Sequence, residues 1–318
     1  MAQRVLEPGQ IETLAQRSIP RIRIPDRAKL FMHRAARLRT LAQASPIGDY
    51  LRLFAAVADA QHAALADFSV ALPSAAQIET AQMHHMPPIS ATTWPRPPQW
   101  RAKLQAICTA VAAQPRLPDE VARLVARLRG TALDDLETQA DVLLGTREGE
   151  IDAAAAPFLM AALQVHWVAL SSCFAPDAVK PLDVPGLCPL CGSLPVASIV
   201  YAQTPYQGYR YLHCALCACE WHMVRVQCSQ CGAAGKDIAY HSLASVTAAD
   251  DAAVGDAAVR AETCEHCHCY RKILYQEKDP AVEPVADDLA SVALDLLLGE
   301  HGYARASGNP LLWQSAEA

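Results

Sequence analysis

The sequence predicts an α+β multidomain protein, in which a mostly α-helical N-terminal domain precedes two small four-cysteine modules and a C-terminal helix. Two observations support this fold class. Ten of the 12 cysteines lie between Cys188 and Cys269, and the 187 residues before Cys188 hold only Cys108 and Cys173. Hydrophobic residues make up 52% of the 318 residues but aromatic residues only 6%, an alanine- and leucine-rich profile that favours helices.

Apolar residues recur at helical spacing through the first half of the chain. We expect apolar helix faces over residues 30–41, 51–72, 121–128 and 133–144. The second face would span about six turns. Prolines crowd the stretch 86–100, which we interpret as a rigid connection between helices, with a peptide-like docking strap as the alternative. The predicted helical domain covers residues 1–180.

The stretch 21–39 is strongly basic, with a single acid, Asp26. Its basic residues are Arg21, Arg23, Arg27, Lys29, Arg34, Arg37 and Arg39. One interpretation is the solvated face of an amphipathic helix, and the other is a docking surface for an acidic protein partner.

Four C-x-x-C pairs repeat one pattern twice. Each copy opens with C-x-x-C-G and closes with C-x-x-C-x-C, with 22 residues between the pairs in the first copy and 32 in the second. The glycine fits a knuckle that needs positive φ at that point. Four thiolates complete a tetrahedral ligand set, so we predict one metal ion in each copy, with pairing across the copies as the alternative. The predicted ligands are Cys188, Cys191, Cys214 and Cys217 in the first set, and Cys228, Cys231, Cys264 and Cys267 in the second.

The two modules are predicted over residues 186–226 and 227–280, after prolines that mark a linker. The expected strands of the first module are 196–202, 209–212 and 221–226. Short hairpins of this kind present C-x-x-C-G knuckles in zinc ribbons and in rubredoxin-like iron sites alike, so the modules are rubredoxin-like or zinc-ribbon-like. Residues 281–318 should form a C-terminal helix and tail.

Two mononuclear tetrathiolate metal ions are therefore expected per chain. Disulfides would need an oxidising compartment, and the N-terminus has no apolar h-region, so we expect no signal peptide. Soft thiolates suit zinc and iron alike, and the spacing does not choose between them.

Two further cysteines, Cys219 and Cys269, each lie two residues past a predicted ligand. We interpret them as small buried residues beneath the knuckles, with a reserve ligand or a reactive thiol as the alternative. The neighbouring histidines are interpreted as supporting or surface residues rather than ligands. These are His213, His222, His266 and His268.

Charge and missing motifs narrow the class of function. Residues 186–280 hold seven Lys or Arg against nine Asp or Glu, and each divalent metal with four thiolates adds about −2, which argues against nucleic acid. No dinucleotide fingerprint, P-loop, H-E-x-x-H or nucleophile elbow is present, and a full thiolate set leaves no open position for a substrate, so we expect no enzyme. No uninterrupted apolar run reaches transmembrane length, so no integral membrane association is expected. A factor that binds a protein client fits best.

Three groups of residues carry a family resemblance. The first is the knuckle segment Cys188-Pro-Leu-Cys191-Gly192 with the later Arg210-Tyr-Leu-His213-Cys214 and Glu220-Trp221. The second is the C-terminal stretch 287–312, with its Asp-Asp-Leu-Ala start and Asn-Pro-Leu-Leu end, and the third is the N-terminal stretch 46–65. Together they resemble the formate dehydrogenase accessory protein family (FdhE) over most of the chain.

The resemblance implies a cytoplasmic accessory factor needed for maturation or activity of respiratory formate dehydrogenase. Its partner would be the catalytic subunit of formate dehydrogenase, a molybdenum- or tungsten-containing protein, bound before twin-arginine export. Rubredoxin-like sites are associated with the family, so the resemblance favours iron over zinc for the two metal ions. A rubredoxin-like electron-transfer protein and a zinc-ribbon nucleic-acid-binding protein are the alternatives.

Overall fold

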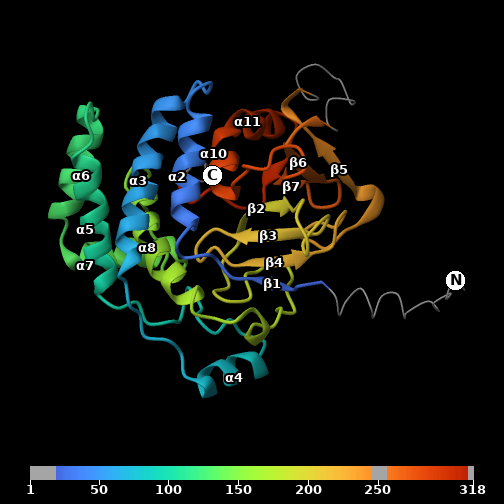
Figure 1. Cartoon of the computed structure of the whole chain (residues 1–318), viewed down its shortest axis with the longest axis horizontal. Helices are drawn as coiled ribbons and strands as arrows, with labels where there is room; N and C mark the ends of the chain where they lie inside the picture. The colour runs from blue at the N-terminus through green and yellow to red at the C-terminus, as the bar shows by residue number, and fades with distance from the viewer. Residues whose placement is uncertain (1–18, 245–255, 314–318) are drawn as a thin grey trace, which may run out of the picture.

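The computed structural model describes residues 19–244 and 256–313. Helices gather on one side of the molecule and a sheet on the other, with the last two helices against α2 and the strands (Figure 1). The helices are α2 (Leu30–Leu41), α3 (Gly48–Ala66), α4 (Ala75–Met83), α5 (Gln99–Ala112), α6 (Asp119–Gly130), α7 (Leu133–Leu143), α8 (Ala156–Ser171), α10 (Pro284–Ala290) and α11 (Val292–Glu300), with 3-10 turns at Pro176–Ala178 and Gly235–Asp237. The predicted fold class, a helical part followed by a sheet-containing region, is confirmed.

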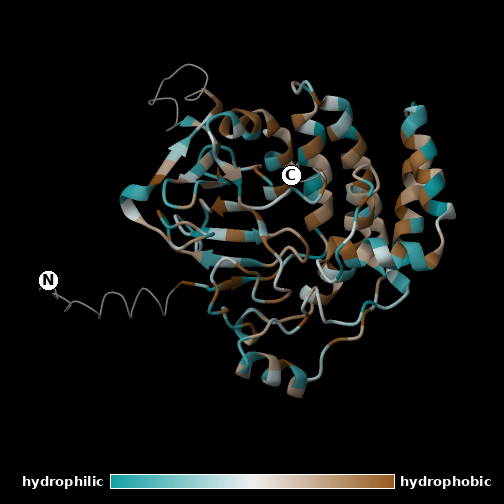
Figure 2. Ribbon diagram, turned by 180° about the vertical axis from the view of Figure 1, so that it is seen from behind, coloured by the Kyte–Doolittle hydropathy of each residue, from teal (hydrophilic) through white to brown (hydrophobic). Residues whose placement is uncertain are grey.

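Helix α8 is the centre of the helical part. Every residue from Ala156 to Ser171 except Met160 is buried, because the helix is apolar on all sides and packs against α3, α5 and α7. The outer helices α5, α6 and α7 carry hydrophobic and hydrophilic residues on the same helix, at the right edge of Figure 2. They bury one face only, as amphipathic helices do.

Two predicted helices differ from the expectation: one ends early and the other is broken into two. Helix α3 ends at Ala66, so the face predicted over 51–72 stops early, and Leu72 is 48% exposed. Ser69 and Val70 are weak helix formers, and Pro73 disfavours helical backbone at the residue before it. The predicted C-terminal helix is broken at Ser291, whose hydroxyl donates to the Asp287 carbonyl at 2.7 Å.

The described strands form one eight-stranded sheet in the order β1-β4-β3-β2-β7-β6-β5, with β8 beside β7. They are β1 (Ile22–Arg23), β2 (Pro195–Val200), β3 (Arg210–Cys214), β4 (Glu220–Met223), β5 (Ile238–His241), β6 (Val259–Cys264), β7 (Cys269–Tyr275) and β8 (Ala304–Arg305). Strand β2 pairs with β7 in parallel, with Ser198 opposite Ile273, and so joins the first cysteine copy to the second. A single sheet therefore carries both thiol sets.

The basic stretch 21–39 is used largely inside the molecule. Arg34 is 1% exposed and pairs with Glu283 at 3.0 Å. Arg37 pairs with Asp287 and Asp279 at 2.5 and 2.6 Å. Neither the solvated face nor the docking surface describes these two residues, because their partners arrive from a segment about 250 positions later in the chain. Helix α2 is thereby clamped to the segment 279–287.

No helix within the described ranges is both long enough and apolar enough to span a membrane.

Candidate metal centres

The four cysteines of the first predicted set converge on one point. Their Sγ atoms all lie within 4.8 Å of one another, with 3.5 Å between Cys188 and Cys217 and 3.4 Å between Cys191 and Cys214. Metal–sulfur bonds of about 2.3 Å place tetrahedral sulfurs about 3.8 Å apart, so the thiols fit a zinc- or iron-sized ion after a small expansion. All four side chains are at most 1% exposed. The set lies inside the main hydrophobic core.

The second set has the same geometry in a different setting. Its Sγ atoms also lie within 4.8 Å of one another, with 3.7 Å between Cys228 and Cys267 and 3.6 Å between Cys231 and Cys264. Cys228 and Cys264 are buried, whereas Cys231 is exposed and Cys267 is half-buried. This set packs in a small cluster of its own around Ile238. The structure thus groups the cysteines within each copy, and one face of the second set meets solvent.

The backbone repeats at the two sets as closely as the thiols do. Gly192 and Gly232 both have positive φ, at +77° and +81°, as the sequence predicts for the residue after the opening pair. The closing pairs share a feature that the sequence did not signal: Ala218 and His268 also have positive φ, at +57° and +52°. Because neither residue is glycine, the closing turns hold strained backbone that the knuckle imposes.

Amide groups point at the sulfurs. In the first set the backbone N–H groups of Leu216 and Cys217 donate to the Cys214 Sγ, both at 3.4 Å. In the second set the N–H of Gln230 donates to the Cys228 Sγ at 3.4 Å. These donors favour thiolate over thiol, which is the form that binds a metal ion.

The two extra cysteines differ from each other. Cys219 is fully buried, and its thiol donates to the Glu220 carbonyl at 3.8 Å. Burial raises the pKa of the Cys219 thiol, which keeps it neutral, and it stands outside the four-thiol set. This fits the predicted small buried residue. Cys269 begins β7 and is only half-buried, so the same interpretation describes it less well.

None of the four histidines joins a thiol set within the described part of the chain. The ring of His213 is buried and bonds Glu220 through Nδ1 at 2.9 Å. The ring of His222 lies 3.3 Å from an Arg21 nitrogen. His266 and His268 are exposed on the second closing knuckle.

The proline-rich stretch 86–100 connects α4 to α5, as predicted, and also contacts the first knuckle. The N–H of Ile89 donates to the Leu190 carbonyl at 3.0 Å, and the N–H of Ala91 donates to the Cys191 carbonyl at 2.8 Å. The Trp167 indole of α8 then donates to the Ile89 carbonyl at 3.1 Å. The stretch 86–100 therefore holds the first knuckle directly. It acts as the predicted docking strap would, but its target lies in the same chain.

A buried arginine joins the two knuckle regions. Arg271 of β7 is 4% exposed, donates to the Ser229 hydroxyl of the second knuckle at 2.8 Å, and also donates to the Pro195 carbonyl after the first knuckle. Gly186 lies against Ser229 so closely that a Cβ there would meet the Ser229 carbonyl oxygen at 2.2 Å. No sequence pattern signals this junction, because Gly186, Ser229 and Arg271 lie about 40 positions or more apart from one another in the chain.

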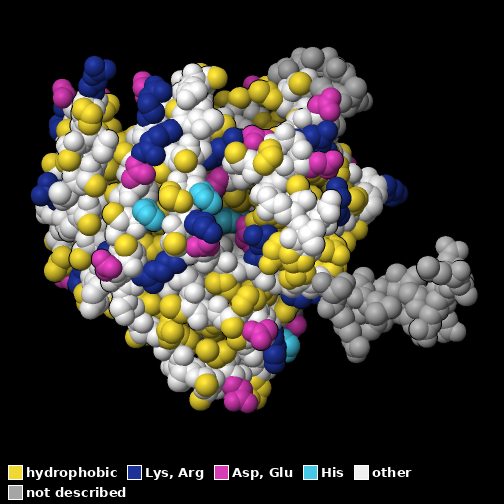
Figure 3. Space-filling model, in the orientation of Figure 1, with side chains coloured by type: hydrophobic (Ala, Val, Ile, Leu, Met, Phe, Trp, Pro, Cys, Tyr) yellow, Lys and Arg dark blue, Asp and Glu magenta, His cyan; other side chains and the backbone are white. Residues whose placement is uncertain are grey.

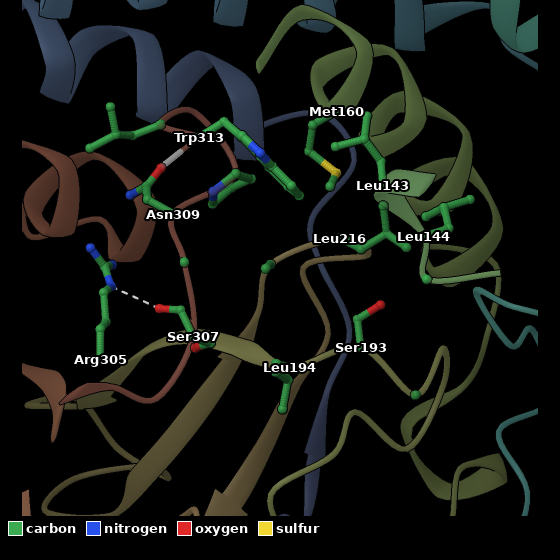
Figure 4. Close-up of a pocket in the computed structure, with 16 residues that line it drawn as sticks. Leu143, Leu144, Met160, Ser193, Leu194, Leu216, Arg305, Ser307, Asn309 and Trp313 are labelled. Carbon is green, nitrogen blue, oxygen red and sulfur yellow. Dashed lines mark hydrogen bonds between the residues drawn. The ribbon is translucent and has the colours of Figure 1, made fainter. Parts of the chain in front are cut away.

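A largely apolar groove of about 710 Å³ lies beside the first knuckles (Figure 4). Leu143 and Met160 line one side of it, Trp313 another, and Leu194 and Leu216 come from the knuckles themselves. The tips of the first knuckles are thus not covered on every side.

The fold and the thiol sets define a protein in which a helical part is joined to one sheet with two four-cysteine groups that could each hold a metal ion. Family models match three consecutive parts of the chain: FdhE, N-terminal, at residues 19–183; FdhE, central domain, at 187–225; and FdhE, C-terminal domain, at 226–312. The chain belongs to the FdhE family of formate dehydrogenase accessory proteins, and the resemblance read from the sequence is confirmed.

Individual relatives match nearly the whole chain. Protein FdhE of Escherichia coli K12 is 39% identical over 308 residues, which is 96% of each chain. Protein FdhE homolog of Cronobacter sakazakii is 38% identical over 317 residues, or 98% of each chain. The crystal structure of the FdhE protein from Pseudomonas aeruginosa matches with a TM-score of 0.79 at 37% identity, covering 92% of this chain and 99% of that one.

Proposed function

We propose that this chain is a maturation factor that binds the catalytic subunit of respiratory formate dehydrogenase in the cytoplasm before twin-arginine export. The observation that carries the proposal is family membership along the whole chain. All eight cysteines of the two four-thiol sets are present and grouped in this chain, which supports the proposal that it functions as other members of the family do.

The eight grouped cysteines are proposed as ligands of two metal ions, with iron favoured over zinc. A tetrathiolate iron ion would supply one-electron redox chemistry, and zinc would only brace the fold. All four positions around each ion would be filled by the protein, so a substrate would have no place to bind the metal. The work of the protein is therefore expected at a surface or cavity that recognises a client.

Deletion of the gene tests the proposed function. Formate dehydrogenase activity should be lost from the cells, while other molybdenum enzymes stay active, because the client rather than cofactor supply is affected. The wild-type gene on a plasmid should restore the activity, and the catalytic subunit should co-purify with the tagged protein from cells blocked in export. Unchanged formate dehydrogenase activity in the deletion strain would sink the proposal.

The solvent-facing second set supports one further candidate, electron transfer by a rubredoxin-like iron site. Cys231 is exposed, so an electron partner could approach that ion closely, whereas the first set is enclosed. Visible thiolate-to-iron absorption that bleaches and returns on reduction and air oxidation would favour this role. A colourless protein that contains zinc would exclude it.

A further inference from the structure

Arg271 of β7 is a buried cation without an acidic partner. Its side chain belongs to a residue that is 4% exposed, and none of the described carboxylates forms an ion pair with it. Every other buried Asp, Glu, Lys or Arg among the described residues has such a partner. Arg210, which is also fully buried, pairs with Glu262 at 2.8 Å. Arg271 is therefore the exception that needs an explanation.

Charges on the surface need no such partner. Figure 3 shows basic and acidic side chains spread over one face of the molecule, where water and salt screen them. Inside a protein an isolated charge is costly, and it is normally retained only where an opposite charge compensates it. The buried guanidinium of Arg271 thus calls for an anion that the described carboxylates do not supply.

The side-chain hydrogen bonds of Arg271 all go to neutral acceptors. Its Nε donates to the Ser229 hydroxyl at 2.8 Å, and its Nη1 donates to the Ser307 hydroxyl and to the Pro195 carbonyl. Its Nη2 has no hydrogen-bond partner among the described residues. These bonds fix the position of the guanidinium but leave its charge uncompensated.

The charged groups around Arg271 direct attention to the second thiol set. Burial, together with repulsion by Arg210 and Arg305, lowers the pKa of Arg271 to about 9. Asp288 attracts the guanidinium, but this carboxylate is already paired with two other cations. The other attractive group is the thiol of Cys228, a proposed metal ligand.

A metal ion in the second set would supply the missing negative charge. Four thiolates around a divalent ion leave a net charge of about −2 on the centre. Ser229, the acceptor that fixes the guanidinium, lies between Cys228 and Cys231 in the opening knuckle. The cation is therefore attached to the loop that carries two of the four proposed ligands.

We propose that Arg271 is the buried counter-charge of the second metal centre and determines how tightly this centre holds a divalent ion. The inference rests on the proposed metal ligation by Cys228, Cys231, Cys264 and Cys267. Arg271 stands outside this ligand set and acts through its charge, which stabilises the anionic, metal-loaded centre. The same charge favours a ferrous over a ferric ion, because the ferrous centre carries one more negative charge.

Two substitutions separate the charge of Arg271 from its hydrogen bonds. Arg271→Lys keeps the charge and loses the guanidinium fork, whereas Arg271→Gln keeps an N–H donor and loses the charge. Zinc affinity is measured on the full chain by competition with a chelator, and the second site is the one that Cys231→Ser removes. Arg271→Gln should weaken zinc binding there about tenfold or more, and Arg271→Lys less than about threefold.

A matched control removes the same charge from the surface. Lys236 is exposed in the same module, so Lys236→Gln should leave the zinc affinity of the second set as in the wild type. A loss in Arg271→Lys as large as that in Arg271→Gln would assign the effect to hydrogen bonding and overturn the inference.

The reduction potential gives a second readout, measured after both sets are loaded anaerobically with ferrous iron. Arg271→Gln should lower the potential of the second set by about 59 mV or more, which corresponds to a tenfold change in the ferric-to-ferrous ratio. Arg271→Lys should keep the potential close to that of the wild type. An arginine that serves only to hold the backbone would not produce this dependence on charge, so equal potentials in wild type and Arg271→Gln would contradict the proposal.

A substitution beside Arg271 keeps the inference testable if the arginine variants do not fold. Ser307→Asp places a carboxylate where Nη1 of Arg271 donates, so the guanidinium is compensated without the metal. This variant should hold zinc at the second set at least about threefold more weakly, while the neutral match Ser307→Asn binds as the wild type does. Undiminished zinc affinity in Ser307→Asp would show that the charge of Arg271 does not serve the metal.

The two proposals fail in different ways. If the wild type binds zinc at the second set and Arg271→Gln binds it equally well, Arg271 is not the counter-charge and the proposed ligation stands. If the wild type holds no metal ion at the second set, the proposed ligation itself fails.

Discussion

At the scale of single residues, His166 shows how the helical core sets a proton affinity. The side chain lies on α8, is 1% exposed, and neither ring nitrogen has a hydrogen-bond partner among the described residues. Its ring packs against Phe68 and Trp167, with centroid distances of 6.0 and 5.0 Å. Burial, helped by the charge of Arg96, lowers the pKa of His166 to about 4. The imidazole is therefore neutral in the folded protein at neutral pH.

This histidine makes stability depend on pH. In the unfolded chain the pKa of His166 returns to about 6.5. Between pH 6.5 and pH 4 the unfolded state therefore binds a proton on His166 and the folded state does not. Its contribution is complete above pH 6.5 and is lost as the pH falls toward 4. Between pH 6.5 and 5 the wild type should lose up to about 2 kcal/mol more unfolding free energy than His166→Leu. Urea unfolding at both pH values checks this, and parallel losses in the two proteins would contradict it.

At the scale of elements, the two four-cysteine sets have the same local geometry but different exposure to solvent. The first is enclosed by the main core and held by the strap at Ile89, whereas the second meets solvent at Cys231. Metal exchange requires a ligand to leave and an outside group to approach. The exposed pair should therefore exchange its metal through smaller local openings.

Chelator kinetics on anaerobically purified protein test this difference. The protein should contain about two metal ions, and a coloured chelator should remove them in two kinetic phases. The ion of the second set should leave at least roughly ten times faster than the ion of the first set, which corresponds to a difference of about 1.4 kcal/mol in the free energy of local opening. Cys231→Ser should remove the fast phase and leave the fold. Cys188→Ser should remove the slow phase and destabilise the first module, because metal binding there is also folding energy. A single release rate for both ions would refute the asymmetry.

At the scale of the whole molecule, ion pairs tie helix α2 to helix α10 and the segment before it. Arg37 is 11% exposed and its partner Asp287 only 1%, so removing the arginine leaves a buried carboxylate without its cation. Arg37→Met should lower the unfolding free energy by about 3 kcal/mol. Arg39→Met, in a pair with Asp59 that is 52% exposed on both sides, should cost less than about 1 kcal/mol. Equal urea midpoints for the two variants would show that the clamp adds nothing.

The cysteine sets and most helices could be predicted from the sequence because their signals are local. The residues that define a C-x-x-C-G knuckle, or the apolar face of a helix such as α6, lie within about a dozen positions of one another. Three other features could not be predicted, because each depends on residues far apart in the chain. These are the ion pairs of Arg37, the contacts of Arg271 and the pairing of β2 with β7. The roles of Arg34 and Arg37 in the basic stretch 21–39 could not be predicted for the same reason, because their acids lie about 250 positions later in the sequence.

The parallel pairing of β2 with β7 has a consequence for the order of synthesis. The ribosome completes the first thiol set at Cys217, when β2 has been made but β7 has not. The four cysteines of the first set can therefore come together on the nascent chain, and would capture the proposed metal ion there, while one edge of β2 still lacks its partner strand. Only after Tyr275 has emerged can β7 close that edge, and Arg34 and Arg37 receive their acids later still. The order of the segments along the chain thus favours folding in which the first four-cysteine set assembles first and the ion pairs of Arg34 and Arg37 form last.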